Sequence, residues 1–235
     1  MPKPFSAAQK ETIREKLMEV GRTCFLRYGL KKTTIDDLVK PAGIAKASFY
    51  LFFDSKEALY MAIFLQEIPE MMDRLMAGSF GSTENTREAL ILMMKGIAHE
   101  MQTNELSRVM LDDPSELERF ADGLDFEGIM QQVAGAYAPI VQAITAAQGR
   151  GEIIPGDPFL ITYSLGLIKM LVINRDHLPP ELYKSMMDFA PQIIAAGLTS
   201  PAMGATAYAE NANQMVESGA DADSSNKDSS RGGKQ

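Results

Sequence analysis

The sequence predicts an all-α protein in which a small N-terminal domain of three helices precedes a larger helical domain. Apolar residues recur at helical spacing through most of the 235 residues. No stretch of useful length alternates apolar and polar residues in the way that a half-buried β-strand does. Breaks containing glycine and proline divide the chain into segments of helical length, and no internal repeat stands out. These observations together indicate the fold class.

The first predicted helix covers residues 6–28. Its apolar residues share one face, and they are Ala7, Ile13, Leu17, Val20, Cys24 and Phe25. An amphipathic helix of this kind is expected to pack behind the segments that follow it. Lys31 and Lys32 are expected in the loop after its end.

Residues 33–59 predict two short helices joined by a tight turn, followed by a capped third helix. Thr33 or Thr34 can cap the first of them, because a hydroxyl accepts a hydrogen bond from the first turn. The Pro-Ala-Gly run at 41–43 ends that helix, since proline lacks a donor and glycine tolerates the left-handed conformation. The second helix is expected over about residues 45–52. Two helices joined in this way form a helix-turn-helix, whose second helix lies in the major groove of DNA.

The charge distribution supports a nucleic-acid partner for the N-terminal segment. The chain carries a net charge of −8, but residues 1–60 carry +4 and the remainder carries −12. A basic module on an acidic body places the favourable field where phosphates would lie. The acidic remainder would repel DNA and so help to orient the approach.

A long third helix is predicted from residue 55, with Asp54 or Ser55 as its N-cap and Glu57 in its first turn. It is expected to run to Pro69, which bends or ends a helix because proline lacks the N–H donor. This helix would connect the N-terminal module to the rest of the chain.

The pattern remains helical after Pro69, with a break from Gly78 to Asn85. Further helices are predicted over residues 86–102, 126–148 and 159–174, and from the Pro179-Pro180 pair to near Gly197. The Asp112-Asp113-Pro114 run is another helix-start signal. Beyond Thr199 the chain is small and polar and is expected to be disordered.

The predicted organisation has three parts. Residues 1–62 form the helix-turn-helix domain, residues 63–199 form a larger helical domain, and residues 200–235 form a disordered tail. The segment 161–175 is apolar around most of its circumference, so it needs burial on more than one side. It is therefore expected to pair with the last helix as a dimer interface.

At these residues the chain resembles the TetR/AcrR family of transcriptional regulators. The order and spacing match over about the first sixty positions. The residues that carry the resemblance are Ile13, Phe25, Gly29, Thr33-Thr34, Ala42-Gly43-Ile44, Phe49-Tyr50, Phe53, Ser55-Lys56-Glu57 and Leu59. Three positions depart from the family pattern. Ala45 stands where a serine usually caps the recognition helix, Ala47 where glycine is common, and Pro41 is unusual.

The resemblance implies a sequence-specific DNA-binding transcriptional regulator, by default a repressor, that acts as a homodimer on a palindromic operator. A small-molecule effector in the second domain would release the DNA. The alternative is a helical protein-interaction module whose DNA-binding head is degenerate. The missing cap at position 45 favours that alternative slightly, whereas the basic head argues against it.

Eight residues are predicted to contact DNA: Thr34, Ala45, Lys46, Ala47, Ser48, Tyr50, Leu51 and Lys56. Lys46 and Ser48 lie early on the recognition helix, where phosphates meet backbone donors. The resemblance implies phosphate contacts for Thr34, Tyr50 and Lys56. Three apolar side chains would meet a thymine methyl group. The alternatives are solvated lysines at 46 and 56 and a packing role for Tyr50.

The second domain is rich in methionine, with most of the chain's 16 methionines after residue 60. Flexible methionines suit an adaptable apolar pocket, although they equally suit an ordinary helical core. Five polar residues are candidates to line such a pocket: His99, Arg108, Tyr137, Tyr163 and Asn174. Each could instead lie at the surface or between helices.

Other functions lack support in the sequence. No GxGxxG, P-loop, HExxH or paired-cysteine motif occurs, so an enzyme, a cofactor and a metal site are not expected. Cys24 is alone, which excludes an internal disulfide. No signal-peptide pattern or long apolar span is seen, and a cytoplasmic location with no membrane association is expected.

Overall fold

The computed structural model describes residues 5–111 and 126–200, and every regular element in these ranges is helical. The N-terminal part contains α1 (Ala7–Lys32), α2 (Ile35–Ala42), α3 (Lys46–Phe49) and α4 (Lys56–Gly78). The rest contains α5 (Thr86–Thr103), α6 (Glu105–Leu111), α8 (Phe126–Gly149), α9 (Pro158–Leu165), α10 (Ile168–Ile173), a 3₁₀ turn η1 (Arg175–His177) and α11 (Pro180–Leu198). The predicted all-α fold class is confirmed.

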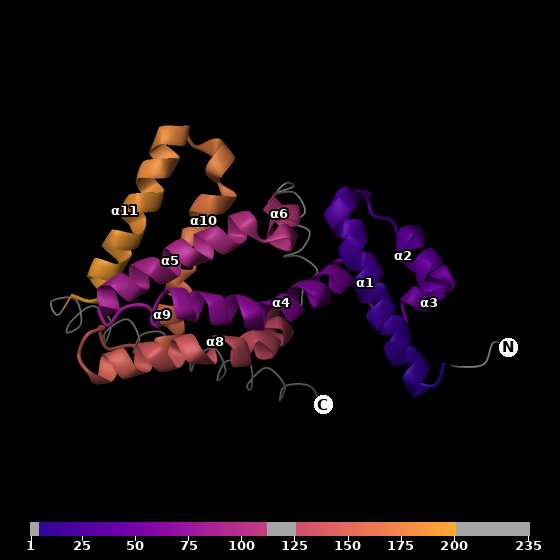
Figure 1. Cartoon of the computed structure of the whole chain (residues 1–235), viewed down its shortest axis with the longest axis horizontal. Coiled ribbons are helices and arrows are strands. Elements are labelled where there is room, and N and C mark those ends of the chain that lie inside the picture. The colour runs from indigo at the N-terminus through magenta and orange to yellow at the C-terminus, as the bar shows by residue number, and fades with distance from the viewer. Residues whose placement is uncertain (1–4, 112–125, 201–235) are drawn as a thin grey trace, which may run out of the picture.

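Figure 1 shows α1, α2 and α3 at one end of the molecule, with α4 running from them into the larger group of helices. We call the first group, together with the first two turns of α4, the head. The remaining helices and the rest of α4 are the body. Leu59, Tyr60 and Ile63 of α4 belong to the head core, whereas Ile68 and Met72 belong to the body core. One helix is therefore common to both cores.

The first helix extends further than predicted. Ser6 begins α1 with a capping box that includes Gln9. Gly29 has a φ of 76°, which kinks the helix, and the chain then regains helical geometry. Lys31 and Lys32 consequently lie in the last turn of α1, and their placement in a loop was wrong.

The helix-turn-helix forms from α2 and α3. Thr34, rather than Thr33, caps α2 through a capping box with Asp37. Gly43 ends α2 in the left-handed conformation, with a φ of 74°. Helix α3 has four residues, so it is shorter than the predicted range of 45–52. Ala45 at its N-cap makes no side-chain hydrogen bond, which leaves the first turn without the stabilisation that a serine would provide.

Helix α4 begins at Ser55, whose hydroxyl accepts from the backbone N–H of Ala58. It continues through Pro69 to Gly78, so of the two expected outcomes, a bend or an end at Pro69, the structure excludes the end. Pro69 is exposed, and buried Ile68 and Met72 flank it on the core side. Apolar burial on both sides of the proline therefore keeps the helix in register across the lost hydrogen bond.

The body contains the predicted helices in the predicted order, together with α6, which was not predicted. The break before Thr86 is present, and α5, α8 and α11 match their predicted ranges within two residues. The predicted helix 159–174 is divided into α9 and α10 at Gly166 and Leu167. The Asp112-Asp113-Pro114 signal and the predicted tail lie outside the described residues.

Within the described ranges, no helix is both long enough and apolar enough to cross a membrane. The same residues hold no group of three or more histidine, cysteine or acidic side chains suited to a metal ion.

Candidate DNA interface and effector cavity

The surface of α3 depends on two aromatic residues that face inward. Phe49 is fully buried and Phe53 nearly so, and their rings lie 6.1 Å apart in the head core. The opposite side of the turn is left to solvent: Tyr50 is 54% exposed and Leu51 is 65% exposed. Ala45, Lys46 and Ala47 are exposed as well, and Ser48 is half-buried. Helix α3 thus presents small, basic and aromatic groups outward.

Lys46 is the cation of this surface. Its ammonium nitrogen lies 3.4 Å from a carboxylate oxygen of Asp36 on α2, and both side chains are exposed. An exposed pair of this kind contributes at most about 1 kcal/mol, so a phosphate can readily replace the carboxylate. Lys46 therefore keeps its charge available for a nucleic acid.

Thr34 has its hydroxyl engaged within the head. It donates to a carboxylate oxygen of Asp37 at 2.6 Å and accepts from the Asp37 backbone N–H at 3.3 Å. The hydroxyl and the backbone N–H of Thr34 both donate to the Asp37 carboxylate, and these two hydrogen bonds hold the pKa of that carboxyl below its usual value. The residue is exposed, but its first role is to begin α2.

Lys56 is half-buried, and its ammonium is engaged within the head. Its ammonium donates to the backbone carbonyls of Leu30, Lys31 and Thr33 at 2.7, 3.1 and 3.1 Å. An ammonium has three donors, so all of them are used at the end of α1. Lys56 ties the start of α4 to the segment that leads into the helix-turn-helix.

Arg14 contributes to the same module although the sequence reasoning did not single it out. Its guanidinium lies 4.6 Å from the centre of the Phe53 ring and donates to the carbonyl of Phe52 at 3.5 Å. A cation over an aromatic face is stabilising by about 0.5–1 kcal/mol at partly exposed sites. Arg14 therefore fixes the turn after α3 against α1.

The head is joined to the body by polar contacts as well as by α4. The Tyr60 hydroxyl donates to the carbonyl of Leu106 on α6. On the neighbouring side, Glu67 accepts from Arg22 of α1 and, at 2.7 Å, from the side-chain amide of Asn104. Leu106 itself is fully buried in the head core. A displacement of α6 would therefore move a side chain that packs in the head core.

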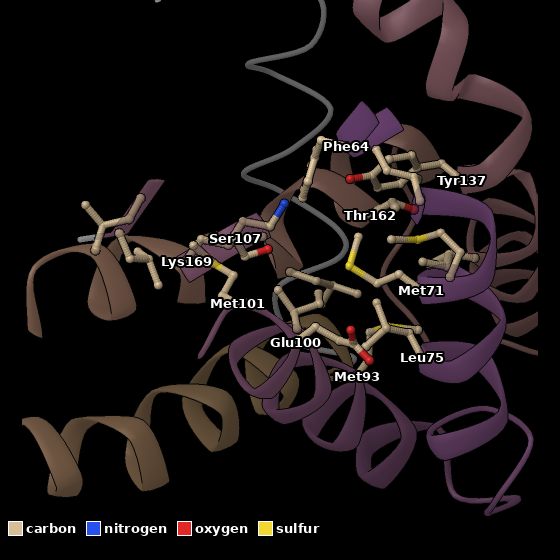
Figure 2. A pocket seen from close by; sticks show the side chains of 18 of the residues that line it. Phe64, Met71, Leu75, Met93, Glu100, Met101, Ser107, Tyr137, Thr162 and Lys169 are labelled. Atoms are coloured by element: carbon tan, nitrogen blue, oxygen red, sulfur yellow. The ribbon is translucent and has the colours of Figure 1, made fainter. Parts of the chain in front are cut away.

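The body encloses a cavity of about 480 Å³ between α4, α5, α6, α8, α9 and α10. Its wall is mostly apolar and includes five methionines: Met61, Met71, Met72, Met93 and Met101. The polar side chains in the wall are Tyr60, Glu100, Ser107, Tyr137, Thr162 and Lys169. Figure 2 shows most of these side chains directed into the cavity. The size and the composition are those of a small-molecule site.

Two charged groups of opposite sign lie in the cavity wall. Glu100 forms a two-fold hydrogen bond with Arg74 of α4, each contact at 2.9 Å, and this lowers the pKa of its carboxyl. Lys169 forms no ion pair or hydrogen bond with any described residue. Burial lowers the pKa of its ammonium. The residue retains some accessible surface because it borders the cavity.

The structure brings only part of the predicted ligand set together. Tyr137 lines the cavity, and Tyr163 stacks against it with ring centres 5.9 Å apart. His99, Arg108 and Asn174 are exposed and do not line the cavity. The side chain of Asn174 instead donates to the carbonyl of Met170 at 2.8 Å.

Sequence reasoning missed Glu100, Ser107 and Lys169. The signal for Lys169 was available, because it is the one charged residue in the apolar segment from Ile161 to Ile173. A lone lysine in such a helical segment either reaches solvent or faces an internal site. Glu100 and Ser107 stand in ordinary amphipathic patterns that give no comparable signal.

Comparison with known proteins agrees with this geometry. The sequence model described as "Bacterial regulatory proteins, tetR family" matches residues 17–63. An uncharacterized HTH-type transcriptional regulator of Bacillus subtilis, YhgD, is 27% identical over 73% of this chain and 88% of its own length. The probable acrEF/envCD operon repressor of Escherichia coli is 25% identical over 52% of this chain and 56% of its own length.

A solved structure shows the same fold. The crystal structure of a TetR-family transcriptional regulator from Pectobacterium atrosepticum aligns with a TM-score of 0.63, over 83% of this chain and 98% of the other, at 19% identity. The helix-turn-helix head, the helical body and these relatives support a DNA-binding transcriptional regulator. Residues 17–63 match the TetR family of bacterial regulatory proteins, and the fold of the chain is that of a TetR-family regulator.

Proposed function

We propose that the protein is a repressor that binds a palindromic operator as a homodimer and is released from it by a small molecule held in the cavity. The observation that carries the DNA-binding part is the outward surface of α3, where Lys46, Tyr50 and Leu51 are exposed over buried Phe49. Exposed apolar and aromatic side chains are costly in water, and a groove contact accounts for them. In this proposal residues 1–62 bind DNA and residues 63–199 bind the effector and the partner, in the cytoplasm.

Within the head we assign different roles to the eight predicted DNA contacts. Lys46 and Tyr50 bind phosphates, with the backbone near Ser48, and Ala45, Ala47 and Leu51 face the bases. Thr34 and Lys56 act mainly by holding the helix-turn-helix in place, since their polar atoms already make hydrogen bonds within the head. Lys56 adds only its charge to the attraction for the DNA backbone.

The homodimer is supported by an apolar face on the last helices. Most of the exposed large hydrophobic side chains belong to α9, α10, α11 and the turn between α9 and α10. They are Phe159, Leu160, Leu167, Met170, Leu182, Phe189 and Ile193. An exposed apolar surface of this kind marks an interaction site. A dimer also suits the DNA, because two heads read two half-sites about 34–36 Å apart.

Effector release is supported by the position of α4. Met61, Phe64 and Met71 of this helix line the cavity, and its first turns form part of the head core. A ligand that fits better with one position of α4 favours the corresponding separation of the two heads. Differential affinity of this kind provides a coupling of typically about 1–3 kcal/mol.

The proposal is tested by fluorescence anisotropy with DNA from upstream of the protein's own gene and a scrambled fragment of equal length. The salt concentration is raised from about 50 to about 200 mM, a range over which phosphate contacts weaken steeply. Lys46→Ala and Tyr50→Ala are compared with Lys95→Ala, which removes an exposed lysine of α5 in the body.

We expect preferential binding to the upstream fragment, with a smaller salt slope in Lys46→Ala and wild-type behaviour in Lys95→Ala. Weak and equal binding to both fragments would direct the search to a distant operator through selection from genomic DNA. If no genomic fragment is selected, the repressor proposal fails and a helical interaction module is left. Operator binding without any effector response would remove only the release step.

A further inference from the structure

We propose that the cavity binds an amphipathic carboxylate, with the carboxylate on Lys169 and the apolar remainder among the methionines of α4 and α5. This inference rests on the proposed effector function and adds the chemical class of the effector. It depends on which polar groups of the cavity already have partners and which do not.

Among the described residues of the cavity wall, Lys169 alone has a side-chain nitrogen. Figure 2 shows that nitrogen directed into the cavity. No carboxylate among the described residues pairs with it, and no described carbonyl accepts from it. An ammonium that is largely removed from water and has no counterion is unfavourable, so an anionic ligand would be bound strongly.

Two hydroxyl groups of the wall lack hydrogen-bond partners in the same way. Ser107 uses its backbone N–H on Asn104, but its side chain has no partner among the described residues. The Tyr137 hydroxyl has none there either, and burial raises its pKa so that it stays a donor. Both side chains point into the cavity in Figure 2. Each can donate to a carboxylate oxygen, which accepts several hydrogen bonds.

The acidic group of the wall does not oppose this ligand. Glu100 is 14% exposed at its side chain and is held by Arg74 in a two-fold hydrogen bond. Its charge is therefore balanced from outside the cavity. Lys169 is therefore the unbalanced charge among the described residues of the wall. A cationic ligand is disfavoured, because the Glu100 carboxylate that would accept from it is already bound to Arg74.

The remaining wall specifies the rest of the ligand. Five methionines, with Phe64, Ile68, Leu75 and Ile140, provide an apolar and deformable surface. A ligand whose remaining part has no polar groups fits that surface, since a further hydroxyl or amide would lose its hydrating water without finding a partner. A single anionic end on an apolar chain or ring matches both parts of the cavity.

The test measures the affinity of two matched pairs of probes by isothermal titration calorimetry on the full chain. The pairs are decanoate with decanol and naphthoate with naphthylmethanol, so that each carboxylate is compared with an alcohol of similar shape. The variant is Lys169→Met, which keeps most of the side-chain length and removes the charge. The matched control is Lys95→Met, which removes an exposed lysine of α5 away from the cavity.

In the wild type we expect at least one carboxylate to bind about tenfold more tightly than its alcohol, because a charge-assisted hydrogen bond replaces a neutral one. In Lys169→Met this preference disappears while the alcohol still binds, and in Lys95→Met it persists. If Lys169→Met does not fold, Tyr137→Phe and Ser107→Ala take its place, and each should lower the preference about threefold or more.

Three results would overturn the inference: alcohols that bind as tightly as carboxylates, a preference that survives in Lys169→Met, or no binding of any of the four probes. Operator binding by the ligand-free protein is measured in parallel. If it is intact while the calorimetry fails, only the ligand class is wrong. If it is absent while the carboxylate binds, the proposed repressor function is wrong and the ligand site remains.

Discussion

Lys56 determines how firmly the helix-turn-helix is attached to the rest of the head. Its ammonium bridges the start of α4 and the three carbonyls at the end of α1. The group is only half-buried, so the hydrogen bonds are partly screened by solvent. We predict that Lys56→Met lowers the free energy of unfolding by about 1–2 kcal/mol. Urea denaturation measures this change. The control is Lys46→Met, which removes one partner of an exposed ion pair and should change the free energy of unfolding by less than about 0.5 kcal/mol. Equal losses in both variants would contradict the assignment.

Glu152 provides a pH-dependent contact in the body. Hydrogen bonds from Arg150 at 2.7 Å and from Thr86 at 2.6 Å lower the pKa of its carboxyl from 4.5 to about 2. A lowered pKa stabilises the fold above the unfolded value near 4.5, and that contribution is lost as the pH falls through about 2. We predict that the difference in Tm between wild type and Glu152→Gln is largest above pH 4.5 and vanishes near pH 2.

Thermal melts across that range, at low and at high salt, provide the measurement. The carboxylate is exposed, so salt should reduce the difference. A difference that stays constant with pH would mean that Glu152 acts through packing alone.

At the residue scale, the sequence indicated the buried and exposed sides of α3 well. Phe49 and Phe53 are in the core, and Lys46, Tyr50 and Leu51 are exposed. Helical periodicity and the family pattern contain this information. The pairing of polar groups could not be predicted, because the carbonyl partners of Lys56 lie more than twenty positions away. The same applies to Lys169, whose environment comes from several helices.

At the scale of the helices, α4 is notable for containing Pro69 in its interior. Proline there removes the hydrogen bond to the carbonyl of Leu65, and a helix interior disfavours proline by about 3 kcal/mol relative to alanine. We predict that Pro69→Ala raises the free energy of unfolding by about 1–3 kcal/mol. Urea denaturation tests this, with the neighbouring exposed Glu70→Ala as the control.

A fall in stability in Pro69→Ala would show that the packing of α4 depends on the bend that proline imposes. In that case the variant should also change operator affinity, since α4 enters both cores. We propose that Pro69 is a point at which the effector signal passes from the body to the head. Unchanged effector response in a stabilised variant would contradict that role.

The boundaries of the helices were predicted to within a few residues where strong local signals exist. Ser55, Asn85 and Asp157 are caps whose side chains hydrogen-bond the first turn. The continuation of α1 beyond Gly29 and the division at Gly166 were not predicted. Single glycines inside an apolar pattern are compatible with a continuous helix, and only the packing of the neighbouring helices decides whether the chain bends.

At the scale of the whole molecule, the exposed apolar face of α9, α10 and α11 predicts that a second protein surface covers it. Phe189, on α11, is 64% exposed. We predict that the wild type sediments at twice the mass of its 25.8 kDa chain and that Phe189→Glu sediments closer to a single chain. A buried, unpaired charge in a dimer interface is strongly unfavourable. The control is Gln142→Glu, at an exposed position of α8, and this variant should remain dimeric.

Phe189→Glu and Gln142→Glu also test whether operator binding depends on the dimer. Phe189→Glu should keep its helical content by circular dichroism but lose operator affinity, because one head reads only one half-site. A monomeric wild type would contradict the homodimer proposal. A dimeric Phe189→Glu would place the interface on another face.

The all-α fold and the order of the helices could be predicted from the sequence because both follow from periodicity and from caps. The cavity could not, since its shape results from how six helices leave a space between them. Methionine-rich segments are equally compatible with a filled core. The exposed apolar face of α9, α10 and α11 was predicted in part, because segment 161–175 is apolar around most of its circumference.

The burial of Leu106 limits how this protein can be re-engineered by recombining parts. Leu106 lies in α6, yet its side chain fills the core around α1 and α4, and its carbonyl receives the Tyr60 hydroxyl. A chimaera that joins residues 1–62 to a foreign sensor body would lack both. The transplanted segment would be left with a leucine-sized void and a buried phenol in need of an acceptor. Successful domain exchange therefore requires that α6 be transferred together with residues 1–62, or that the recipient supply its own leucine and carbonyl at that place.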